Sequence, residues 1–599
     1  MTSIRLTQFA GLMPELSAKL KRKDNAQIAH NCLLYDGKLR AMPAYFQYNT
    51  LPQAPLSMFR ALQGLGAPIN GRVQWDYQIS EAIYVDGAPF AQGLYGISDV
   101  TPYTSSYIAA RFGPSSVGFS LTTAGIPAPV IISSPVVSIT ASGFQAVRPN
   151  VVGYAITSIR DVSQFGTIGV QESAPTLLGI VGYPLLGNLW YEGDSVTISA
   201  PLRTLESNET AFRLYRTITA IESGEQLVNT FDTDWNLVAT VPIVDSAIPV
   251  FSYIDNSPTQ FIPGDLLLSK NFQCPNLSHS PINFGITESG WFWATTNYEV
   301  IFSERYLSHA WPIANYLAIN QVDTIVDATG FYDNVFLGTA GRPYRVNVQS
   351  SDDDTLHINA YPFPEHQPCL SGTLVTAPFG ALYTSVNGVV SLEENRMQVI
   401  TRDLLNGGNI LYHDCNTEFK FQDITRAAWF NGWYIGYAPN GKIFVYQAPE
   451  DLNDVHPFQQ LITMDGPVNA APGPWAIGDY GLQIAYGTDL YYWPVPGWVR
   501  PNDNPQKLCY KWKSKKFVFP GITTFAAAKV VWDCDGEVCF KLIGDCRHIY
   551  ERKVTNCNPF RLPHNWRHIE FEIEVTGTGS VSEIHVASSM QELTEVNTE

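Results

Sequence analysis

Residues 433–446, WYIGYAPNGKIFVY, hold two runs of aromatic and β-branched residues on either side of one turn. Asn440-Gly441 forms the centre of that turn, and Asn-Gly tolerates the positive φ angles of a tight hairpin. The flanking runs are rich in the side chains that favour strands. The stretch therefore predicts a β-hairpin.

The same pattern of strand, turn and strand recurs through the C-terminal half of the chain. Its turns lie near Asn297, Gly341, Gly388, Gly441, Gly487 and Gly536. Successive turns are separated by 44 to 53 residues, and a period of this size with paired strands in each unit is typical of β-propeller blades. We therefore predict an all-β protein built on a propeller of six or seven blades. A large irregular array of sandwiches is the alternative.

The composition agrees with an all-β chain and argues against several classes of protein. Among 599 residues, 13% are aromatic and 15% are charged, while 45 glycines and 40 prolines supply turns. The net charge of −18 repels nucleic acid and argues against a sequence-reading nucleic-acid binder. The chain has no apolar run of transmembrane length, and its first residues lack the order of a signal peptide, so we expect neither a membrane span nor export.

A separate unit is predicted over residues 126–262. It opens with the proline-rich segment IPAPVIISSP at 126–135, and short alternating strands follow, such as SVTISAPL at 195–202. We interpret the unit as a β-sandwich inserted into the chain. A tyrosine-bearing strand followed by ESAP at 172–175 resembles the fibronectin type III module.

The first 45 residues differ in charge from the rest. They hold seven basic and three acidic residues, whereas the remainder of the chain carries a net charge of −22. Four of the basic residues lie close together, at Lys19, Lys21, Arg22 and Lys23. The segment is either a solvated loop or helix start, or a docking edge for an acidic neighbouring subunit, because opposite charges steer assembly and set its register.

No motif argues positively for catalysis. Gly436 to Lys442 is spaced like a phosphate-binding loop, but Ile443 stands where Ser or Thr must hold magnesium, so we interpret it as a turn. His564 and His568 are four residues apart, yet they lack the glutamate and the helix of a zinc protease. Both patterns are therefore expected to be structural.

Acidic and thiol side chains give no metal site either. The run Asp352-Asp353-Asp354 lacks the spaced ligands and the glycine of a calcium loop, so a solvated loop is favoured. Four of the nine cysteines are grouped at spacings that match no zinc template, namely Cys534, Cys539, Cys546 and Cys557. We interpret them as reduced thiols in a core. We predict no catalytic, cofactor-binding or metal-binding residues, no cofactor, and a protein that is not an enzyme.

Several segments together, in their order along the chain, resemble one family. They are FAGLMP at 9–14, DNAQIAHNC at 24–32, GKLR at 37–40, GIPAP at 125–129, ESAP at 172–175, FRLYR at 212–216, YID at 253–255, VIFSERYLSHAWP at 300–312, CLS at 369–371, GALYTSVNGVV at 380–390, ITRD at 400–403, WRH at 566–568 and ASSMQEL at 587–593. The chain resembles the tail nozzle proteins of short-tailed bacteriophages (podoviruses), also called tail tubular protein B. Leu307-Ser308, where a proline is expected, and the cysteine-rich stretch 534–557 depart from the family pattern.

The resemblance implies a structural virion protein of the phage tail, assembled in the cytoplasm of the bacterial host. Six copies, a homohexamer, would form a ring that continues the DNA channel below the adaptor. The ring would retain the genome, dock tail fibre proteins and pass double-stranded DNA to the host at ejection. No cofactor and no stable membrane insertion are implied. An acidic conduit suits this role because it repels the phosphates of the DNA that slides through it.

The resemblance also implies how the chain is divided. The two chain ends would form a platform, with residues 1–50 as its N-terminal segment and 561–599 as its C-terminal segment. Residues 51–125 would form the first propeller or platform strands, 126–262 the inserted sandwich and 263–560 the propeller blades.

Two groups of candidate site residues follow from these expectations. Lys19, Lys21, Arg22 and Lys23 are the candidates for docking to an acidic surface of the adaptor. The loops around Asp352-Asp353-Asp354 and around 451–454 are the candidates for closing the channel, by an order or hinge change on host contact.

Two other functions stay open at the level of the sequence. A glycan-binding or polysaccharide-degrading propeller in receptor recognition would use exposed aromatic rings to stack on sugars. Trp429, Trp433 and Tyr434 are aromatic residues of predicted strands, and we interpret them as core residues rather than a sugar platform. A cytoplasmic propeller that serves as a scaffold for host proteins is the third alternative.

Overall fold

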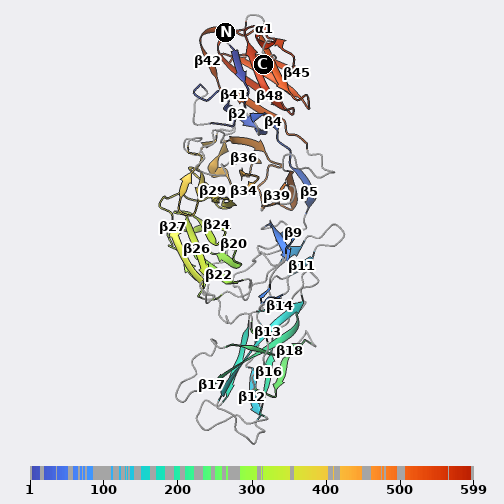
Figure 1. Cartoon of the computed structure of the whole chain (residues 1–599), viewed down its shortest axis with the longest axis vertical. Helices are drawn as coiled ribbons and strands as arrows, with labels where there is room; N and C mark the ends of the chain where they lie inside the picture. Colours follow the sequence, from blue (N-terminus) through green and yellow to red (C-terminus); the bar gives the residue numbers. More distant parts are fainter. Residues whose placement is uncertain are drawn as a thin grey trace.

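The computed structural model shows a chain made of strands and turns (Figure 1). It describes residues 3–13, 19–34, 37–50, 58–64, 68–69, 72–73, 77–84, 109–111, 120–122, 129, 131, 135–140, 150–161, 170–173, 175–182, 194–202, 209–220, 234–243, 250–258, 265–267, 283–305, 312, 314–350, 356–402, 409–410, 419–447, 460–473, 475–477, 481–494, 506–563 and 566–594. Within these residues, strands β1 to β48 are accompanied by one α-helix, α1 (Met590–Thr594), and one short 3-10 helix. The predicted all-β class is confirmed.

Six groups of four antiparallel strands form the middle of the molecule, here called the ring, and follow one another around a common centre (Figure 1). The first group is β6 (Met58–Gly64), β9 (Tyr77–Tyr84), β10 (Ala109–Arg111) and β11 (Ser120–Thr122); the second is β20 (Asn283–Ile286), β21 (Trp291–Thr295), β22 (Glu299–Arg305) and β23 (Tyr316–Ala318); the third is β24 (Ile325–Phe331), β25 (Asn334–Thr339), β26 (Tyr344–Ser350) and β27 (Leu356–Pro362). The fourth is β28 (Val375–Ala377), β29 (Gly380–Ser385), β30 (Gly388–Leu392) and β31 (Met397–Val399); the fifth is β34 (Arg426–Phe430), β35 (Trp433–Tyr437), β36 (Lys442–Gln447) and β37 (Gln460–Asp465); the sixth is β38 (Trp475–Ile477), β39 (Gly481–Tyr486), β40 (Asp489–Pro494) and β5 (Phe46–Thr50).

Tight turns close the hairpins of the ring where the sequence predicts them. Pairing of the strands on either side confirms the hairpins at Asn297, Gly341, Gly388, Gly441 and Gly487. Between β34 and β35, Asn431 and Gly432 both have positive φ, 51° and 78°, as a type I′ turn requires. Gly436 lies opposite Phe444 in the next strand, and a Cβ at this glycine would come within 2.1 Å of the Phe444 ring.

The predicted hairpin at Gly536 is wrong. The strands before and after this turn, β43 (Ala527–Trp532) and β44 (Val538–Gly544), belong to two different sheets. Gly536 does have a positive φ of 98°, but a corner that passes from one sheet to another needs this conformation as much as a hairpin does. Local turn chemistry therefore could not distinguish the two connections.

A strand from the N-terminal region completes the sixth group of the ring. β5 pairs antiparallel with β40, so that Phe46 lies opposite Tyr492. Just before β5, the Tyr45 ring stacks on Trp493 with centroids 5.5 Å apart. The last strands of the ring are thus held by a segment that precedes all the others in sequence.

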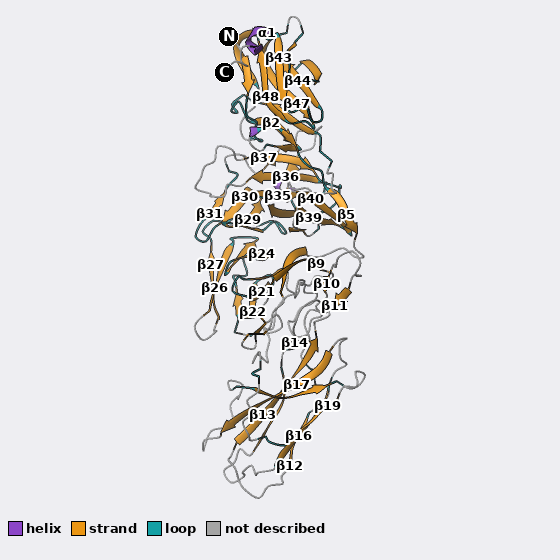
Figure 2. Cartoon of the chain, turned by 45° about the vertical axis from the view of Figure 1, so that its right-hand side comes forward, coloured by secondary structure: helices purple, strands orange, loops and turns teal. Residues whose placement is uncertain are grey.

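Both ends of the chain fold together into two sheets, here called the platform, at one end of the molecule (Figure 2). One sheet has the order β1 (Ser3–Leu6), β48 (Val581–Ala587), β43 and β46 (Phe560–Arg561). The other has the order β2 (Ala26–His30), β41 (Tyr510–Ser514), β47 (Arg567–Gly577), β44 and β45 (His548–Val554), with β42 (Phe517–Thr524) also on β47.

The C-terminal part of the platform begins earlier than the sequence suggests. Strands β41 to β44 pair with β2, β47 and β48, and β45 (up to Val554) pairs with β44, instead of forming a further blade of the ring. These strands carry the same aromatic and β-branched pattern as the ring strands, because any strand with one buried face shows it. Their partners are set by long-range pairing, which the local pattern does not contain.

Parallel pairing of β2 with ring strand β37 joins the platform to the ring in a single ten-stranded sheet. The amide of Asn31 donates to the Thr463 carbonyl at 2.8 Å, and the amide of Leu12 donates to the Leu461 carbonyl at 2.7 Å. One hydrophobic cluster runs through both parts and includes Trp512 of the platform together with ring residues of β35 and β36. Platform and ring therefore share a core.

A third unit, formed by strands within residues 136–255, lies at the opposite end of the molecule from the platform (Figure 2). A three-stranded sheet has the order β12 (Val136–Thr140), β16 (Ser195–Pro201), β19 (Val250–Asp255). A five-stranded sheet contains β13 (Asn150–Asp161), β14 (Val170–Glu172), β15 (Thr176–Gly182), β17 (Glu209–Ala220) and β18 (Asn236–Pro242). Alternate residues of β16 are buried, and side chains from both sheets form one core.

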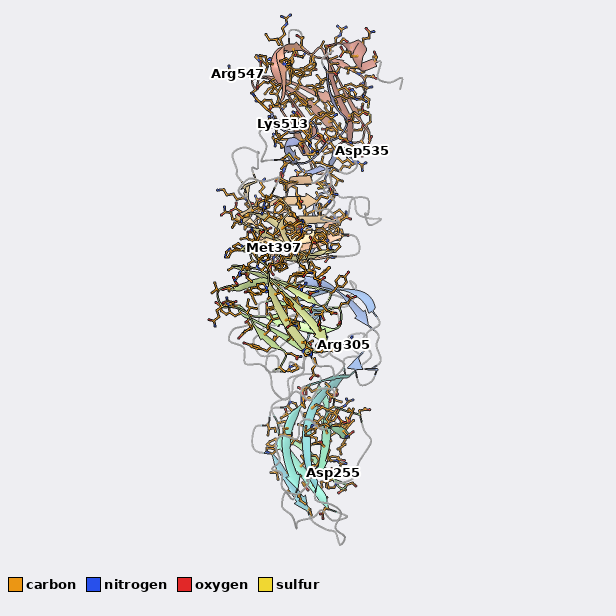
Figure 3. The ribbon with its side chains drawn as sticks, turned by 60° about the vertical axis from the view of Figure 1, so that its left-hand side comes forward. Asp255, Arg305, Met397, Lys513, Asp535 and Arg547 are labelled. Atoms are coloured by element: carbon orange, nitrogen blue, oxygen red, sulfur yellow. The ribbon has the colours of Figure 1, made fainter. Side chains whose placement is uncertain are left out.

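Two buried carboxylates organise the polar interior of this unit. Glu172, 3% exposed, accepts hydrogen bonds from Tyr215 Oη at 2.7 Å and Arg213 Nη1 at 2.8 Å. Asp255, also 3% exposed, accepts hydrogen bonds from Tyr154 Oη at 2.8 Å and from Arg216 Nη1 at 2.6 Å (Asp255 is labelled in Figure 3). The segments ESAP, FRLYR and YID, far apart in sequence, therefore meet in buried ion pairs.

Replacing Arg216 by methionine should lower the free energy of unfolding of this unit by about 3–5 kcal/mol, because the Asp255 carboxylate would stay buried without its cation. Thermal and denaturant unfolding of the purified variant measure the loss. Lys553→Met, which removes an exposed ion pair with Glu537, is the matched control and should cost less than about 1 kcal/mol. Equal small losses in the two variants would contradict the account.

Candidate docking site on the platform

The four basic residues singled out in the sequence do not form one surface. Lys19 is exposed, and its Nζ lies 2.7 Å from Glu570 Oε1 on β47. Lys516 contacts the other oxygen of Glu570 at 3.0 Å. Hydrogen bonds from Lys19 and Lys516 lower the pKa of Glu570. Lys19 thus fastens its own segment to the platform.

Lys21 points into the protein. Lys21 is only 6% exposed, and its Nζ donates a hydrogen bond to the Met13 carbonyl. Burial lowers the pKa of Lys21 to about 8. Lys21 therefore holds the N-terminal segment together and offers no surface to a partner. The sequence expectation differs because charge alone does not show which side chains turn inward.

Arg22 and Lys23 face solvent, as Lys19 does, but they are not engaged by Glu570. They lie in a turn closed by a hydrogen bond from the Asn25 amide to the Arg22 carbonyl at 3.2 Å, directly before β2. Within the described residues, neither side chain forms an ion pair with a carboxylate. Leu20, 73% exposed, lies beside them. We call residues 19–25 the basic turn.

The face of the platform sheet next to the basic turn carries charges that neutralise one another. Lys513 Nζ lies 2.8 Å from Glu572 Oε2, and Gln27 Nε2 donates to the other oxygen of Glu572 at 2.8 Å (Lys513 is labelled in Figure 3). One strand further on, Lys541 contacts Glu574 at 3.4 Å. These charges are paired within the chain, whereas Arg22 and Lys23 are free to act on a partner.

A polar cluster fixes the junction between platform and ring. Asp465, at the end of β37, contacts His30 Nε2 at 2.9 Å and Lys442 Nζ at 2.8 Å. Its backbone amide donates to Asn31 Oδ1 at 3.0 Å. The hydrogen bond from His30 and the Lys442 ammonium hold the pKa of Asp465 well below its usual range. Sequence reasoning missed this cluster, because residues more than 400 positions apart show no local signal of contact.

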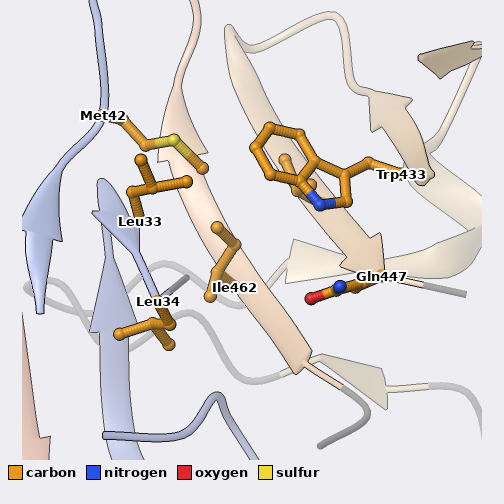
Figure 4. Close-up of a pocket in the computed structure, with 7 residues that line it drawn as sticks. Leu33, Leu34, Met42, Trp433, Gln447 and Ile462 are labelled. Carbon is orange, nitrogen blue, oxygen red and sulfur yellow. The ribbon is translucent and has the colours of Figure 1, made fainter. Parts of the chain in front are cut away.

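A small pocket at the same junction has an apolar lining (Figure 4). Its walls are Leu33, Leu34, Met42, Trp433, Val445, Gln447 and Ile462. The lining contains no titratable or nucleophilic side chain, so the pocket has no means of acid–base or covalent catalysis. It is a seam between packed strands of the platform and the ring.

The channel-closing candidates Asp352, Asp353 and Asp354 lie outside the described residues, as does the loop around 451–454. The strands that flank the aspartate run, β26 and β27, pair antiparallel from Ser350 and Leu356 onward. The structure therefore shows the hairpin that carries this loop.

The residues considered for other chemistry have structural roles. Trp433 and Tyr434 are buried, and Tyr434 Oη donates to the Thr373 carbonyl at 2.9 Å, which confirms their interpretation as core residues. Trp429 is partly buried against the same core. His568 is buried beside Asp545, with Nδ1 3.0 Å from Oδ2, while His564 lies outside the described residues.

The interpretation of the grouped cysteines as core thiols is wrong. Cys534 and Cys546 are exposed, and Cys539 and Cys557 are half-buried. Cys534 and Cys546 occupy turns with φ of 55° and 58°, and such turns lie at the surface. In the part of the chain that the structure describes, no group of three His, Cys, Asp or Glu side chains could hold a metal ion, and no helix is long and apolar enough to span a membrane.

No protein-family model matches the chain, and no curated protein is significantly similar to it. Similar solved structures include BamB from Moraxella catarrhalis, with 8% identity, a TM-score of 0.24 and coverage of 63% of this chain and 98% of that one. Sqt1 from Saccharomyces cerevisiae shows 8% identity and a TM-score of 0.27, and the match covers 78% of this chain and 100% of Sqt1. The Pan2 WD40 domain from Neurospora crassa shows 9% identity and a TM-score of 0.23, and the match covers 50% of this chain and 89% of that domain. Likenesses at such TM-scores carry no argument about fold or function.

Replacing Lys21 by methionine should remove a pH dependence of stability. Between about pH 8 and 10.5 the unfolded chain still holds the Lys21 proton that the folded chain has lost, so the wild-type stability rises with pH, by up to about 3 kcal/mol. Denaturant unfolding at several pH values compares the wild type with Lys21→Met and with the exposed control Lys23→Met. The control should keep the wild-type slope, and an unchanged slope in Lys21→Met would contradict the burial of the ammonium.

Proposed function

We propose that the chain is the tail nozzle protein of a short-tailed bacteriophage, a structural component of the virion without enzymatic activity. The geometry that carries the proposal is the division of the molecule into a platform made by both chain ends, a ring, and a third unit at the far end (Figure 2). A conduit that attaches at one end and meets its surroundings at the other needs such polarity. The order of the segments that resemble the nozzle family supports the same function.

Under this proposal the ring is a six-bladed β-propeller. Each group of four antiparallel strands is one blade, and β5 closes the circle by completing the sixth blade. Closure by a strand from the other end of the circle prevents the first and last blades from separating, and each blade keeps only short edges. The unit that contains β12 to β19 is the inserted sandwich, similar to fibronectin type III, and it would form the distal tip or dock fibres.

Six copies of the chain would form a closed ring around the DNA channel, as heterologous contacts with rotational symmetry do. The net charge of −18 supports passage of DNA without adhesion, since an acidic wall repels phosphates. The proposed protein would retain the genome in the particle and release it to the host at ejection. It would be assembled in the host cytoplasm and remain in the tail.

The basic turn is the proposed contact with the adaptor. Arg22 and Lys23 provide unpaired positive charge and Leu20 provides an apolar contact at the platform end of the molecule. Opposite charges on the adaptor would steer docking, and the apolar side chain would add buried area. Lys19 and Lys21 stabilise the turn instead of touching the partner.

A glycan-binding or polysaccharide-degrading propeller is the competing function. It needs exposed aromatic platforms. Trp433 and Tyr434 are buried, and the exposed rings among the described residues include Tyr332 and Tyr361. Lectin binding or polysaccharide cleavage by the purified protein would favour this alternative.

Reversing the charges in Arg22→Glu/Lys23→Glu should block addition of the purified protein to phage particles that carry the adaptor but no nozzle. The platform should still fold, because both side chains are exposed; Lys21 is left unchanged, since a buried glutamate would unfold the segment. Sedimentation and electron microscopy of the mixtures measure addition.

Arg396→Glu/Arg402→Glu is the charge-matched control, because these exposed arginines belong to the ring. It should add as well as the wild type. Normal addition of the Arg22→Glu/Lys23→Glu variant would overturn the docking surface, and failure of the wild type to add would overturn the function.

A further inference from the structure

Two thiols meet at the surface of the platform. Cys534 lies in the loop after β43, and Cys557 lies in the loop before β46. Cys557 Sγ donates to the Trp532 carbonyl oxygen at 3.2 Å, and Cys534 Sγ lies 3.9 Å from the same oxygen. Both sulfur atoms thus lie within 4 Å of one carbonyl oxygen, although the cysteines are 23 positions apart in sequence.

The pair is open to small reagents. Cys534 is exposed and Cys557 is half-buried, whereas Cys32 and Cys369 are buried. Three other accessible thiols have different partners. Lys516 Nζ contacts Cys546 Sγ at 3.0 Å, Cys539 Sγ contacts Glu551 Oε1 at 3.3 Å, and Cys509 Sγ lies 3.9 Å from the Tyr510 carbonyl oxygen. Desolvation and the neighbouring Cys557 thiol raise the pKa of Cys534. Oxidation of the pair should accordingly be faster at alkaline pH, because the thiolate is the attacking species.

We propose that Cys534 and Cys557 form a reversible disulfide, which makes this loop pair a redox modification site. One thiolate attacks a sulfur of a small-molecule disulfide such as oxidised glutathione, and one glutathione thiolate leaves. The second protein thiolate attacks the mixed disulfide, the protein S–S bond forms, and the second glutathione leaves. Two protein thiols are oxidised, one small disulfide is reduced to two thiols, and the two protein protons pass to the released thiolates.

The bond would secure the edge of the platform sheet. Between the two cysteines run β44 and β45, the hairpin that forms this edge. A crosslink at its base ties the hairpin to the end of β43, which belongs to the other sheet, and restricts the unfolded chain. A protein made in a reducing cytoplasm would carry the dithiol and would gain the bond in an oxidising medium. That sequence of events rests on the proposed function, whereas the bond itself does not.

The test treats the purified full-length chain with oxidised glutathione at pH 8 and, separately, with dithiothreitol. The oxidised protein should lose about 2 Da in intact mass, and non-reducing peptide mapping should find the peptide of Cys534 joined to that of Cys557. Its midpoint of thermal unfolding should exceed that of the reduced protein by on the order of 5 °C. Dithiothreitol should reverse both changes.

Matched variants separate this bond from other thiol chemistry. Cys534→Ser and Cys557→Ser should abolish the crosslink and the thermal shift, while Cys546→Ser and Cys539→Ser should keep both. Glutathione left attached at Cys534 without closure, a crosslink between two chains, or a crosslinked protein with an unchanged midpoint would overturn the proposal. These outcomes do not depend on whether the protein adds to phage particles.

Discussion

The addition of β2 to the edge of ring strand β37 determines how the two ends of the chain relate to the ring. A single parallel register, His30 opposite Thr463, continues the ring sheet into the platform. Asp465 reinforces it by contacting His30 from the N-terminal segment and Lys442 from the ring. Since parallel edges offer few hydrogen bonds over so short a contact, this polar cluster and the shared core around Trp512 make the attachment rigid.

A second constraint acts further along the same segment. After leaving the platform, the N-terminal segment enters the ring as β5 and closes its sixth group of strands. The segment therefore belongs to the platform through β2 and to the ring through β5. One continuous segment thus links the platform to the strand that completes the ring, which suits the proposed conduit for DNA held under pressure.

The structural predictions that the fold confirms rest on local signals, namely turn residues and the alternation of buried side chains along a strand. The hairpins at Gly388 and Gly441 follow from Asn-Gly turns between strand-forming runs, and the alternation in β16 follows from one buried face. The exceptions depend on distant partners. Gly536 joins two sheets, Lys21 turns inward to the Met13 carbonyl, and β41 to β44 pair with strands near the chain ends. The candidate docking site was thus found by its charge, but which of its cations are free was decided by tertiary packing.

The symmetry of the purified protein tests the central claim most directly. The account predicts that its mass in solution, alone or on particles without a nozzle, corresponds to six chains, and that electron microscopy shows a sixfold ring with the platforms on one face. A monomer that ignores such particles and binds or cuts bacterial polysaccharide would contradict the account and identify a sugar-recognition protein instead.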